Sequence, residues 1–161
     1  MQLPSQLAAQ GFVLRDATPA DLQDYIDIKR ACYRKYVDEY YGGWVEEVQI
    51  GMNMNVFNRM LGKTCFKKLL LNNETVGFFS YDEKEDQIGG ITIQMLEAAR
   101  NKGVGSFYLQ HITGISDSTG KPIYLKVFKS NPAQNLYRRF GFAVYEENES
   151  HYWMRYGPRE A

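Results

Sequence analysis

The most informative part of this sequence is the run Arg100-Asn101-Lys102-Gly103-Val104-Gly105-Ser106. It lies between an alternating segment that ends at Met95 and a segment with helical spacing. Two glycines at such a junction let the backbone bring several N–H groups close to one point, and the positive end of the following helix favours an anion there. The side chains of Arg100 and Lys102 add full positive charges. The run predicts a phosphate-binding turn, although a tight turn built for geometry alone would show the same two glycines.

This turn differs from two common glycine-rich nucleotide sites. A P-loop requires Gly-Lys-Ser/Thr after a four-residue spacer, which is missing, and a dinucleotide fingerprint requires a third glycine where Tyr108 stands. The turn also follows a predicted strand meander rather than the first strand of a parallel sheet. A nucleotide-binding α/β protein is therefore the least favoured interpretation.

A second informative stretch begins at Asn131 and ends at Phe142. We expect Asn131 to cap a short helix and Gly141 to end it in the left-handed conformation. Leu136 and Phe140 are four residues apart and are predicted to face inward. Tyr137 falls one position beyond that stripe, where its hydroxyl can reach the edge of a cleft. The plainer alternative is an amphipathic tyrosine at a packing boundary.

The periodicity of the remaining chain predicts a mixed sheet covered by helices. Helical spacing runs from about 19 to 40 and from 44 to 60, where Trp44, Val48, Met52, Val56 and Met60 lie four apart. Strands are expected at 12–15, 65–71, 76–81, 87–95, 123–128, 142–146 and 150–156, and further helices at 103–115 and 132–139. Gly89 and Gly90 suggest a bulge or a close approach in one strand.

Length and composition indicate one ordinary globular domain over residues 1–161, with a core from about 12 to 156. Lysine plus arginine and aspartate plus glutamate both number 19, so no global field favours a nucleic acid or a membrane surface as partner. Cys32 and Cys65 lie far apart without a histidine cluster, so we expect no metal site. No targeting or membrane-spanning segment is recognisable, and a cytoplasmic location is expected. A homodimer is left open.

Together, the two stretches resemble the GNAT family of N-acetyltransferases. The family motif Arg/Gln-x-x-Gly-x-Gly/Ala is matched by Arg100, Gly103 and Gly105, and its downstream element by Asn131, Leu136, Tyr137, Gly141 and Phe142. The order of predicted elements from about 12 to 156 is also similar. The resemblance implies an α+β, single-domain acyl-CoA N-acyltransferase fold. In that fold a central, mixed, mostly antiparallel sheet of six to seven strands is flanked by about four helices.

The resemblance further implies acetyl-CoA as acyl donor and no metal. In similar proteins the strand before the motif splays from its neighbour and pairs with the pantetheine arm, while the pyrophosphate lies on the amides of the turn. The implied cofactor-binding residues are Met95, Leu96, Glu97, Arg100, Lys102, Gly103, Val104, Gly105, Ser106 and Asn131. The sequence departs from the family at Glu97-Ala98-Ala99, where relatives commonly show Pro-Glu-Tyr.

Direct acyl transfer needs a neutral amine, stabilisation of an oxyanion and a proton for the departing thiolate. The resemblance places Tyr137 near the cofactor sulfur, and a phenol with a pKa near 10 is protonated at neutral pH and can supply that proton. A backbone N–H near Met95 could hold the thioester oxygen. The base is not assigned, because Glu46, Glu47, Glu97, His151 and water relays all remain open.

The acceptor is expected against the first two helices and the last strands, where much of the aromatic content lies. Tyr33, Tyr36 and Trp44 are the predicted substrate-binding residues, because aromatic faces attract cations and apolar bodies. The alternative is that they form ordinary core and rim. The predicted function is direct transfer, within a ternary complex, of the acetyl group to a primary amine of a small molecule or a peptide. The alternative is a non-catalytic acyl-CoA-binding or regulatory domain with the same fold.

Overall fold

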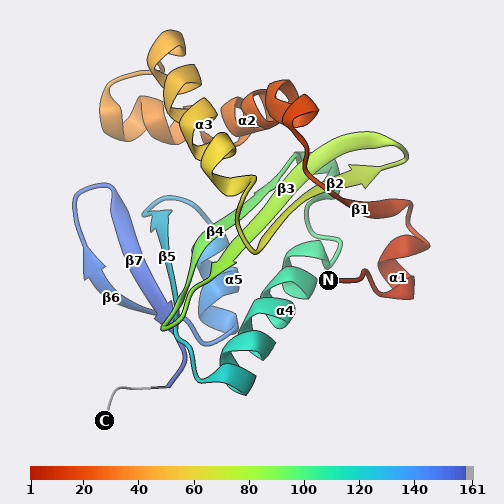
Figure 1. The fold of residues 1–161 in the computed structure, drawn as a ribbon. Helices are drawn as coiled ribbons and strands as arrows, with labels where there is room; N and C mark the ends of the chain where they lie inside the picture. Colours follow the sequence, from red (N-terminus) through yellow and green to blue (C-terminus); the bar gives the residue numbers. More distant parts are fainter. Residues whose placement is uncertain (159–161) are drawn as a thin grey trace.

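The computed structural model describes residues 1–158, so residues 159–161 of the predicted domain lie outside the described part (Figure 1). Seven strands form one sheet in the order β1-β2-β3-β4-β5-β7-β6. The strands are β1 (Phe12–Asp16), β2 (Cys65–Leu71), β3 (Glu74–Glu83), β4 (Ile88–Met95), β5 (Ile123–Phe128), β6 (Ala143–Glu147) and β7 (His151–Tyr156). Neighbouring strands are antiparallel except β4 and β5, which confirms the predicted mixed, mostly antiparallel sheet.

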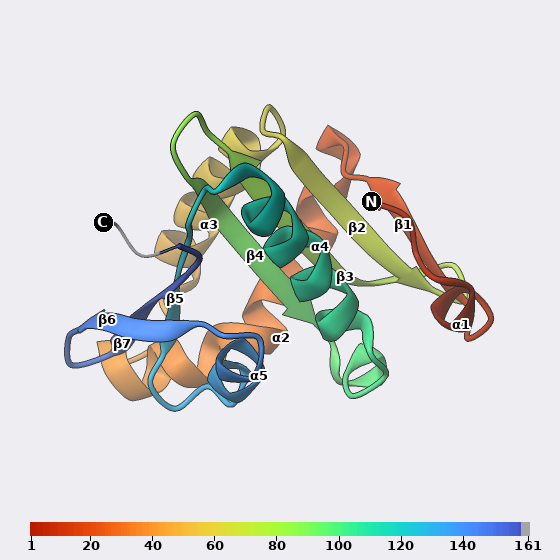
Figure 2. The same cartoon turned by 90° about the horizontal axis from the view of Figure 1, so that it is seen from below.

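Helices cover both faces of this sheet. They are α1 (Ser5–Ala8), α2 (Leu22–Tyr41), α3 (Glu46–Met60), α4 (Val104–Thr119) and α5 (Ala133–Arg139), with 3₁₀ turns η1 (Pro19–Asp21) and η2 (Glu97–Ala99). Figures 1 and 2 show α2 and α3 on one face and α4 and α5 on the other. The short α1 beside β1 was not predicted. It carries a single buried apolar residue, Leu7, and so has no periodic stripe.

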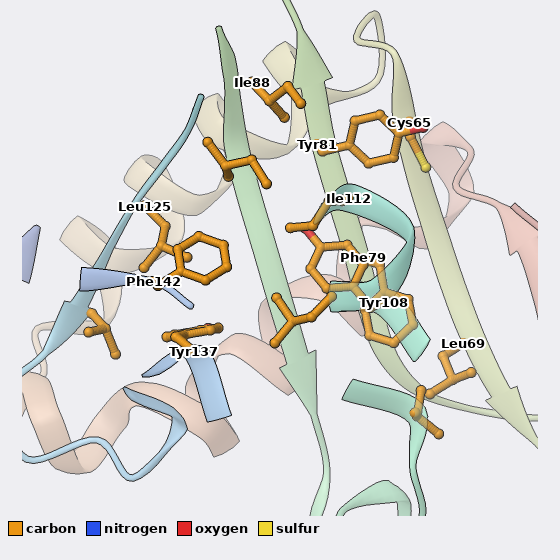
Figure 3. Close-up of a cluster of buried hydrophobic side chains, with 14 of the residues drawn as sticks. Cys65, Leu69, Phe79, Tyr81, Ile88, Tyr108, Ile112, Leu125, Tyr137 and Phe142 are labelled. Atoms are coloured by element: carbon orange, nitrogen blue, oxygen red, sulfur yellow. The ribbon is translucent and has the colours of Figure 1, made fainter. Parts of the chain in front are cut away.

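The core beneath α4 is built on aromatic stacking (Figure 3). Phe79 of β3 and Tyr108 of α4 stack with ring centroids 5.0 Å apart, and neither is exposed to solvent. The Tyr108 hydroxyl donates a hydrogen bond to the carbonyl oxygen of Ser80 at 2.5 Å. Because its polar end is satisfied, Tyr108 can fill the centre of this core.

The core beneath α2 and α3 is a second aromatic cluster. The ring of Tyr25 lies 5.3 to 5.9 Å from the rings of Phe57, Phe66 and Phe78. Both parities of β2 are therefore buried, with Leu69 under α4 and Phe66 under α2 and α3. A sheet covered on both faces explains why this strand reads as an almost continuous apolar run.

The predicted start of α2 is confirmed. The carboxylate of Asp21 accepts hydrogen bonds from the backbone N–H and the hydroxyl of Thr18, at 2.8 and 3.2 Å, which closes a capping box. Lys68 of β2 donates to the same carboxylate at 2.9 Å and ties the helix start to the sheet. Gly42, in the left-handed conformation with φ of 77°, ends the helix.

Helix α3 is also confirmed, but the four-apart stripe that marked it does not form one buried face. Val48 and Met52 are 54% and 57% exposed, whereas Phe57 and Met60 are buried. Figure 1 shows the first half of α3 rising away from the sheet. Only the second half of α3 packs against the rest of the protein, and Val48 and Met52 of the first half remain exposed.

The functional part of the fold is the separation of β4 from β5. The two parallel strands are registered at Ile88 and Ile123, and no further pair between them is registered along their described length. Figure 2 shows them diverging beyond that point. A bulge falls in β4 where Gly90 was expected to mark one: the register with β3 shifts there, and Ser80 Oγ donates to the Gly90 carbonyl at 2.7 Å. The split leaves the β4 edge without a neighbouring strand.

Candidate active site

The turn before α4 exposes a set of unpaired backbone donors. Asn101 and Gly103 have left-handed φ values of 59° and 92°, and the first N–H bonded inside the helix is that of Phe107, which donates to the Gly103 carbonyl at 3.0 Å. The N–H groups of residues 102–106 have no protein acceptor in the described chain. They lie at the positive end of a 16-residue helix, which is a favourable place for phosphate oxygens. The predicted residues Lys102, Gly103 and Ser106 are thus brought together.

The second glycine of the turn serves close packing. A Cβ atom on Gly105 would lie 3.0 Å from Leu136 Cδ2 of α5 and 3.5 Å from Ile93 Cδ1 of β4. Gly105 is buried and its φ is not positive, so its role is the approach of α4 to α5 and the sheet, unlike that of Gly103. Val104 beside it is also buried, at 1% exposure. At residues 104 and 105 a ligand can therefore contact the backbone N–H but not a side chain.

Arg100 takes a position that the sequence did not predict. Its Nε donates to the Met95 carbonyl at 2.8 Å, and its guanidinium also contacts Cys32 Sγ of α2 at 3.8 Å. The charge of Arg100 therefore ties the turn back to the end of β4. Lys102 is exposed and is left as the cation of the turn itself.

The end of β4 offers one free backbone edge. The N–H of Leu96 donates to the Val76 carbonyl of β3 at 2.8 Å, so that donor is already used. In an antiparallel pair the residue beside a hydrogen-bonded one points its N–H and C=O to the opposite edge. Met95 therefore directs these groups toward the gap left by β5. Glu97 is exposed in η2.

A cleft of about 790 Å³ lies between the α2–α3 pair and strands β4, β5 and β7. Its lining includes residues from both helices and from the split strands, among them Tyr33, Trp44, Gln94, Lys126, Tyr137 and His151. The split in the sheet and the cleft thus bring together elements that are far apart in sequence. Asn131 also lines the cleft; the N-cap of α5 is Pro132 rather than Asn131, but Asn131 Oδ1 still accepts a hydrogen bond from Ala133 N, the first residue of the helix, at 2.9 Å.

Tyr137 is the buried residue of α5 rather than a residue beyond its buried stripe. It is 6% exposed, whereas Leu136 and Phe140 are only half-buried. Figure 3 shows its ring beside Phe142, and their centroids lie 5.9 Å apart. Burial raises the pKa of the Tyr137 hydroxyl well above its usual value of 10, so the phenol keeps its proton at every pH of interest. The helix is too short for a two-residue stripe to show its inward face.

Of the four side chains left open as the base, His151 at the start of β7 is the one that lines the cleft. It is 7% exposed, and its Nδ1 lies 2.7 Å from Ser150 Oγ and 3.4 Å from the Tyr41 hydroxyl. Its ring lies 4.1 Å from that of Phe128. Burial, assisted by the charge of Lys126, lowers the pKa of His151 below 6.5, which keeps the imidazole neutral at pH 7.

The three carboxylate candidates lie elsewhere. Glu46 is bonded to the guanidinium of Arg30 and accepts from Trp44 Nε1 at 2.6 Å. Glu47 and Glu97 are exposed in the first turns of α3 and η2. None of these three side chains is part of the cleft lining.

The predicted substrate-binding aromatics divide into two groups. Tyr33 and Trp44 line the cleft. Tyr36 is 5% exposed, stacks on Phe128 with centroids 5.2 Å apart and is not part of the lining. Tyr40 also stacks on Phe128, with centroids 5.6 Å apart. Much of the aromatic content of α2 therefore fastens this helix to the end of β5.

Several polar residues of the cleft were not singled out by the sequence. The Gln94 amide is buried beside the Tyr25 hydroxyl, and the Nδ2 of Asn53 is buried without a hydrogen-bond partner in the described chain. Lys29 lies over the ring of Tyr33 at 4.5 Å, and burial lowers its pKa to about 8. These residues belong to β4, α3 and α2, so no local motif could have grouped them.

Comparison with known families settles the relationship. A family model described as the acetyltransferase (GNAT) family matches residues 25–142, which is well over half of the chain. The chain belongs to the GNAT acetyltransferase family. The match spans the turn before α4 and ends at Phe142, so the two stretches that first suggested the family both lie within it.

Solved structures of other GNAT proteins share this fold. The PaiA N-acetyltransferase of Thermoplasma acidophilum in complex with coenzyme A has 16% identity and a TM-score of 0.69, over 91% of this chain and 99% of that one. The ribosomal-protein-S18-alanine N-acetyltransferase of Escherichia coli has 18% identity and a TM-score of 0.64, over 93% and 96%. No curated protein sequence matches significantly. At these identities the similarity shows the GNAT fold alone.

Residues 1–158 of this GNAT domain also bear on a metal site and on a membrane span. Within them no group of three or more histidine, cysteine or acidic side chains is arranged to hold a metal ion. None of the helices described there combines the length and the apolar character that crossing a bilayer would require.

Proposed function

We propose that this chain is an N-acetyltransferase that moves the acetyl group of acetyl-CoA directly to a primary amine. The observation that carries the proposal is the convergence of two features on the split between β4 and β5. The free amides of residues 102–106 stand at its outer end, and the cleft with Tyr137 and His151 stands beside it. This arrangement suits a long donor that carries phosphates at one end and a reactive thioester at the other.

The residues of the turn fit the phosphate end of such a donor. The N–H groups at the start of α4 can donate hydrogen bonds to its phosphate oxygens, and Lys102 adds a positive charge. The arm that follows the phosphates can run along the β4 edge at Met95, where the N–H is unpaired and the carbonyl already accepts from Arg100 Nε. Asn131 holds the start of α5 in place through its Oδ1. Its Nδ2 donates no hydrogen bond within residues 1–158. When bound, acetyl-CoA supplies the acetyl group as an activated thioester.

His151 is proposed as the base that frees the amine of its proton. If the Ser150 hydroxyl donates to Asn148 Oδ1, 3.2 Å away, its oxygen can accept from Nδ1–H of His151. Nε2 then carries the free electron pair, and the lowered pKa keeps it available near neutral pH. Asn148 Oδ1 also accepts from the backbone N–H of His151 at 2.7 Å, which fixes the position of the ring.

Tyr137 is proposed as the acid. The amine nitrogen forms a bond to the acetyl carbon, the bond between carbon and sulfur breaks, and the departing sulfur takes the phenolic proton. The raised pKa keeps the hydroxyl protonated before the reaction; because it also makes the phenol a weaker acid, the proton moves only as negative charge builds on the departing sulfur, and the phenolate regains a proton afterwards. The N–H of Met95 at the open edge is proposed to stabilise the oxyanion between these two events.

Titration calorimetry with acetyl-CoA, CoA and ATP tests the binding half of this proposal. We expect acetyl-CoA and CoA to bind and ATP to bind more weakly or not at all. Replacing the exposed Lys102 with glutamine should weaken CoA binding, whereas Lys84→Gln, an exposed lysine of the β3–β4 loop, should not. No affinity for either coenzyme would reject the proposal. Binding without turnover would instead favour the non-catalytic acyl-CoA-binding domain.

A further inference from the structure

The acceptor side of the cleft is lined by cations without matching anions. Lys29 of α2, Arg59 of α3 and Lys126 of β5 contribute to its wall, and no aspartate or glutamate does. None of these three cations has an ion-pair partner among the described residues, although eight ion pairs occur elsewhere in them. Since the formal net charge of the chain is +0, this concentration of positive charge is local.

The strand register places these charges on one face. Lys126 is paired with Trp153 of β7 in the antiparallel register, so the two side chains lie on the same side of the sheet, and both line the cleft. Lys29 faces them from α2, and its charge and that of Lys126 repel each other enough to contribute to the lowered pKa of Lys29. Repulsion between two unpaired lysines is unfavourable unless a ligand relieves it.

A second observation points to a ligand at the same place. Gln94 is 2% exposed and Asn53 is 4% exposed, and Nδ2 of Asn53 lacks a hydrogen-bond partner in the described chain, whereas the Gln94 amide lies beside the buried Tyr25 hydroxyl and acts on the pKa of that group. Buried polar groups are rarely left unpaired, and each such group costs about 1 to 3 kcal/mol. Both residues line the cleft. Amide N–H₂ groups donate to anionic oxygens, and the Gln94 Oε1 can accept from an amine.

We infer that the acceptor of this enzyme is an amine that also carries a carboxylate or phosphate group, bound by Lys29, Arg59 and Lys126. The aromatic rings of Tyr33 and Trp153 provide an apolar wall for the spacer between amine and anion. This inference rests on the proposed acetyltransferase function and adds to it the chemical class of the substrate. It also runs against the expectation from aromatic content alone, which favoured any cationic or apolar amine.

Matched pairs of acceptors test the inference in a thiol-release assay. Each pair differs only in the anion: a set of α-amino acids against their amides for the carboxylate, and phosphoethanolamine against ethanolamine for the phosphate. For the best acceptor we expect kcat/KM of the anionic member to exceed that of its neutral partner about 10-fold or more. A preference within the amino-acid pairs would indicate a carboxylate, and a preference for phosphoethanolamine over ethanolamine would indicate a phosphate.

Charge variants assign the preference to the cleft. Lys126 is exposed, so Lys126→Glu should fold normally and lower the ratio of kcat/KM for the anionic member to kcat/KM for the neutral member about 10-fold or more; the ratio is the readout because Lys126 also acts on the pKa of His151 and therefore on both rates. Lys29→Arg should retain the preference and Lys29→Met should lose it. Lys84→Gln, which removes a lysine outside the cleft, is the control and should change nothing. An unchanged melting temperature shows that each variant is folded.

Failure of this inference can be told from failure of the proposed function. Equal kcat/KM within each pair, a preference for the neutral members, or a preference that survives Lys126→Glu would overturn the inference while acetyl transfer still stands. If acetyl-CoA binds but no member of the panel is acetylated, the same pairs are titrated into the CoA-bound protein and their binding is measured by calorimetry. Selective binding of the anionic members would support the inference, and equal or absent binding would overturn it. No binding of acetyl-CoA would reject the proposed function itself.

Discussion

The imidazole of His151 and the hydroxyl of Ser150 form a short contact, with 2.7 Å between Nδ1 and Oγ. The two residues are adjacent in sequence, and Asn148 orients both through the side-chain oxygen that accepts their backbone N–H groups at 2.7 and 2.9 Å. This local turn at the start of β7 holds one imidazole nitrogen and leaves the other for the cleft. It is the arrangement expected of a base whose tautomer must be fixed.

Replacement of His151 with glutamine should lower kcat about 100-fold or more, the usual contribution of a general base. In the native protein the acidic limb of the rate profile should lie below pH 6.5, because burial lowers the pKa of His151 and the neutral form persists to lower pH. The groups facing this ring are Ser150, Tyr41, Phe128, Trp153 and the cation Lys126. The measurement is kcat against pH at saturating substrates.

The variant must lose the acidic limb as well as rate. A reduced rate with the same limb would mean that another group is the base, and that the loss came from packing against Phe128. Ser150→Ala is the companion variant, since it keeps the imidazole and removes its partner. We expect it to lower the rate by less than the loss of the imidazole does.

Tyr137→Phe should lower kcat about 100-fold while the affinity for acetyl-CoA stays within about twofold. The substitution removes one hydroxyl from a buried ring, so stability should change little and binding can be compared directly by calorimetry. Because the pKa of Tyr137 is raised well above 10, no alkaline limb from this group is expected in the native profile. An undiminished rate at saturating substrate would remove Tyr137 from its assigned role.

Two glycines of α4 give opposite expectations for alanine substitution. Gly105→Ala should destabilise the fold by about 1 to 3 kcal/mol, because its Cβ would meet Leu136 at 3.0 Å in a packed interior. Gly114→Ala should stabilise it by about 0.5 to 1 kcal/mol, because this glycine is exposed within the helix and has open space around its Cβ position. Urea unfolding measures both. Equal effects would mean that helix propensity rather than packing decides at residue 105.

Asp21→Asn should destabilise the protein by about 1 to 3 kcal/mol at neutral pH. Burial opposes ionisation of Asp21, but hydrogen bonds from Lys68 and Thr18 outweigh it and hold the pKa of the carboxyl below 3.8. Its contribution is therefore fully present above pH 3.8 and is lost as the pH falls through the lower native pKa. The stability difference between native protein and variant should shrink in that acidic window. A difference that stays constant with pH would contradict the ionic role.

The sequence predicted the elements whose signals are local. The run from Arg100 to Ser106 predicts a strand-to-helix turn through its two glycines, and the helical spacing from about 19 to 40 predicts α2. Periodicity also placed most strands correctly, because alternation is a property of neighbouring residues. The direction of the Arg100 side chain was missed, since its partner Met95 depends on how the turn folds back over β4.

The residues that line the cleft could not be predicted from local sequence patterns. Lys29, Arg59 and Lys126 come from three elements, and only the packing of α2 and α3 over the split sheet makes them neighbours. The inward turn of Tyr137 likewise depends on where α5 docks rather than on its own seven residues. The aromatic content drew attention to α2, but much of it serves to join that helix to Phe128.

Acetyl transfer itself is best followed by mass spectrometry of the amine together with release of free thiol, using purified protein, acetyl-CoA and the acceptor panel. We expect one acetyl group on the amine nitrogen for each thiol released, with both signals requiring the amine and both reduced in Tyr137→Phe. Thiol release that proceeds without an amine, or acetyl-CoA binding with no acetylated product from any amine of the panel, would contradict the proposal that this GNAT domain is an N-acetyltransferase.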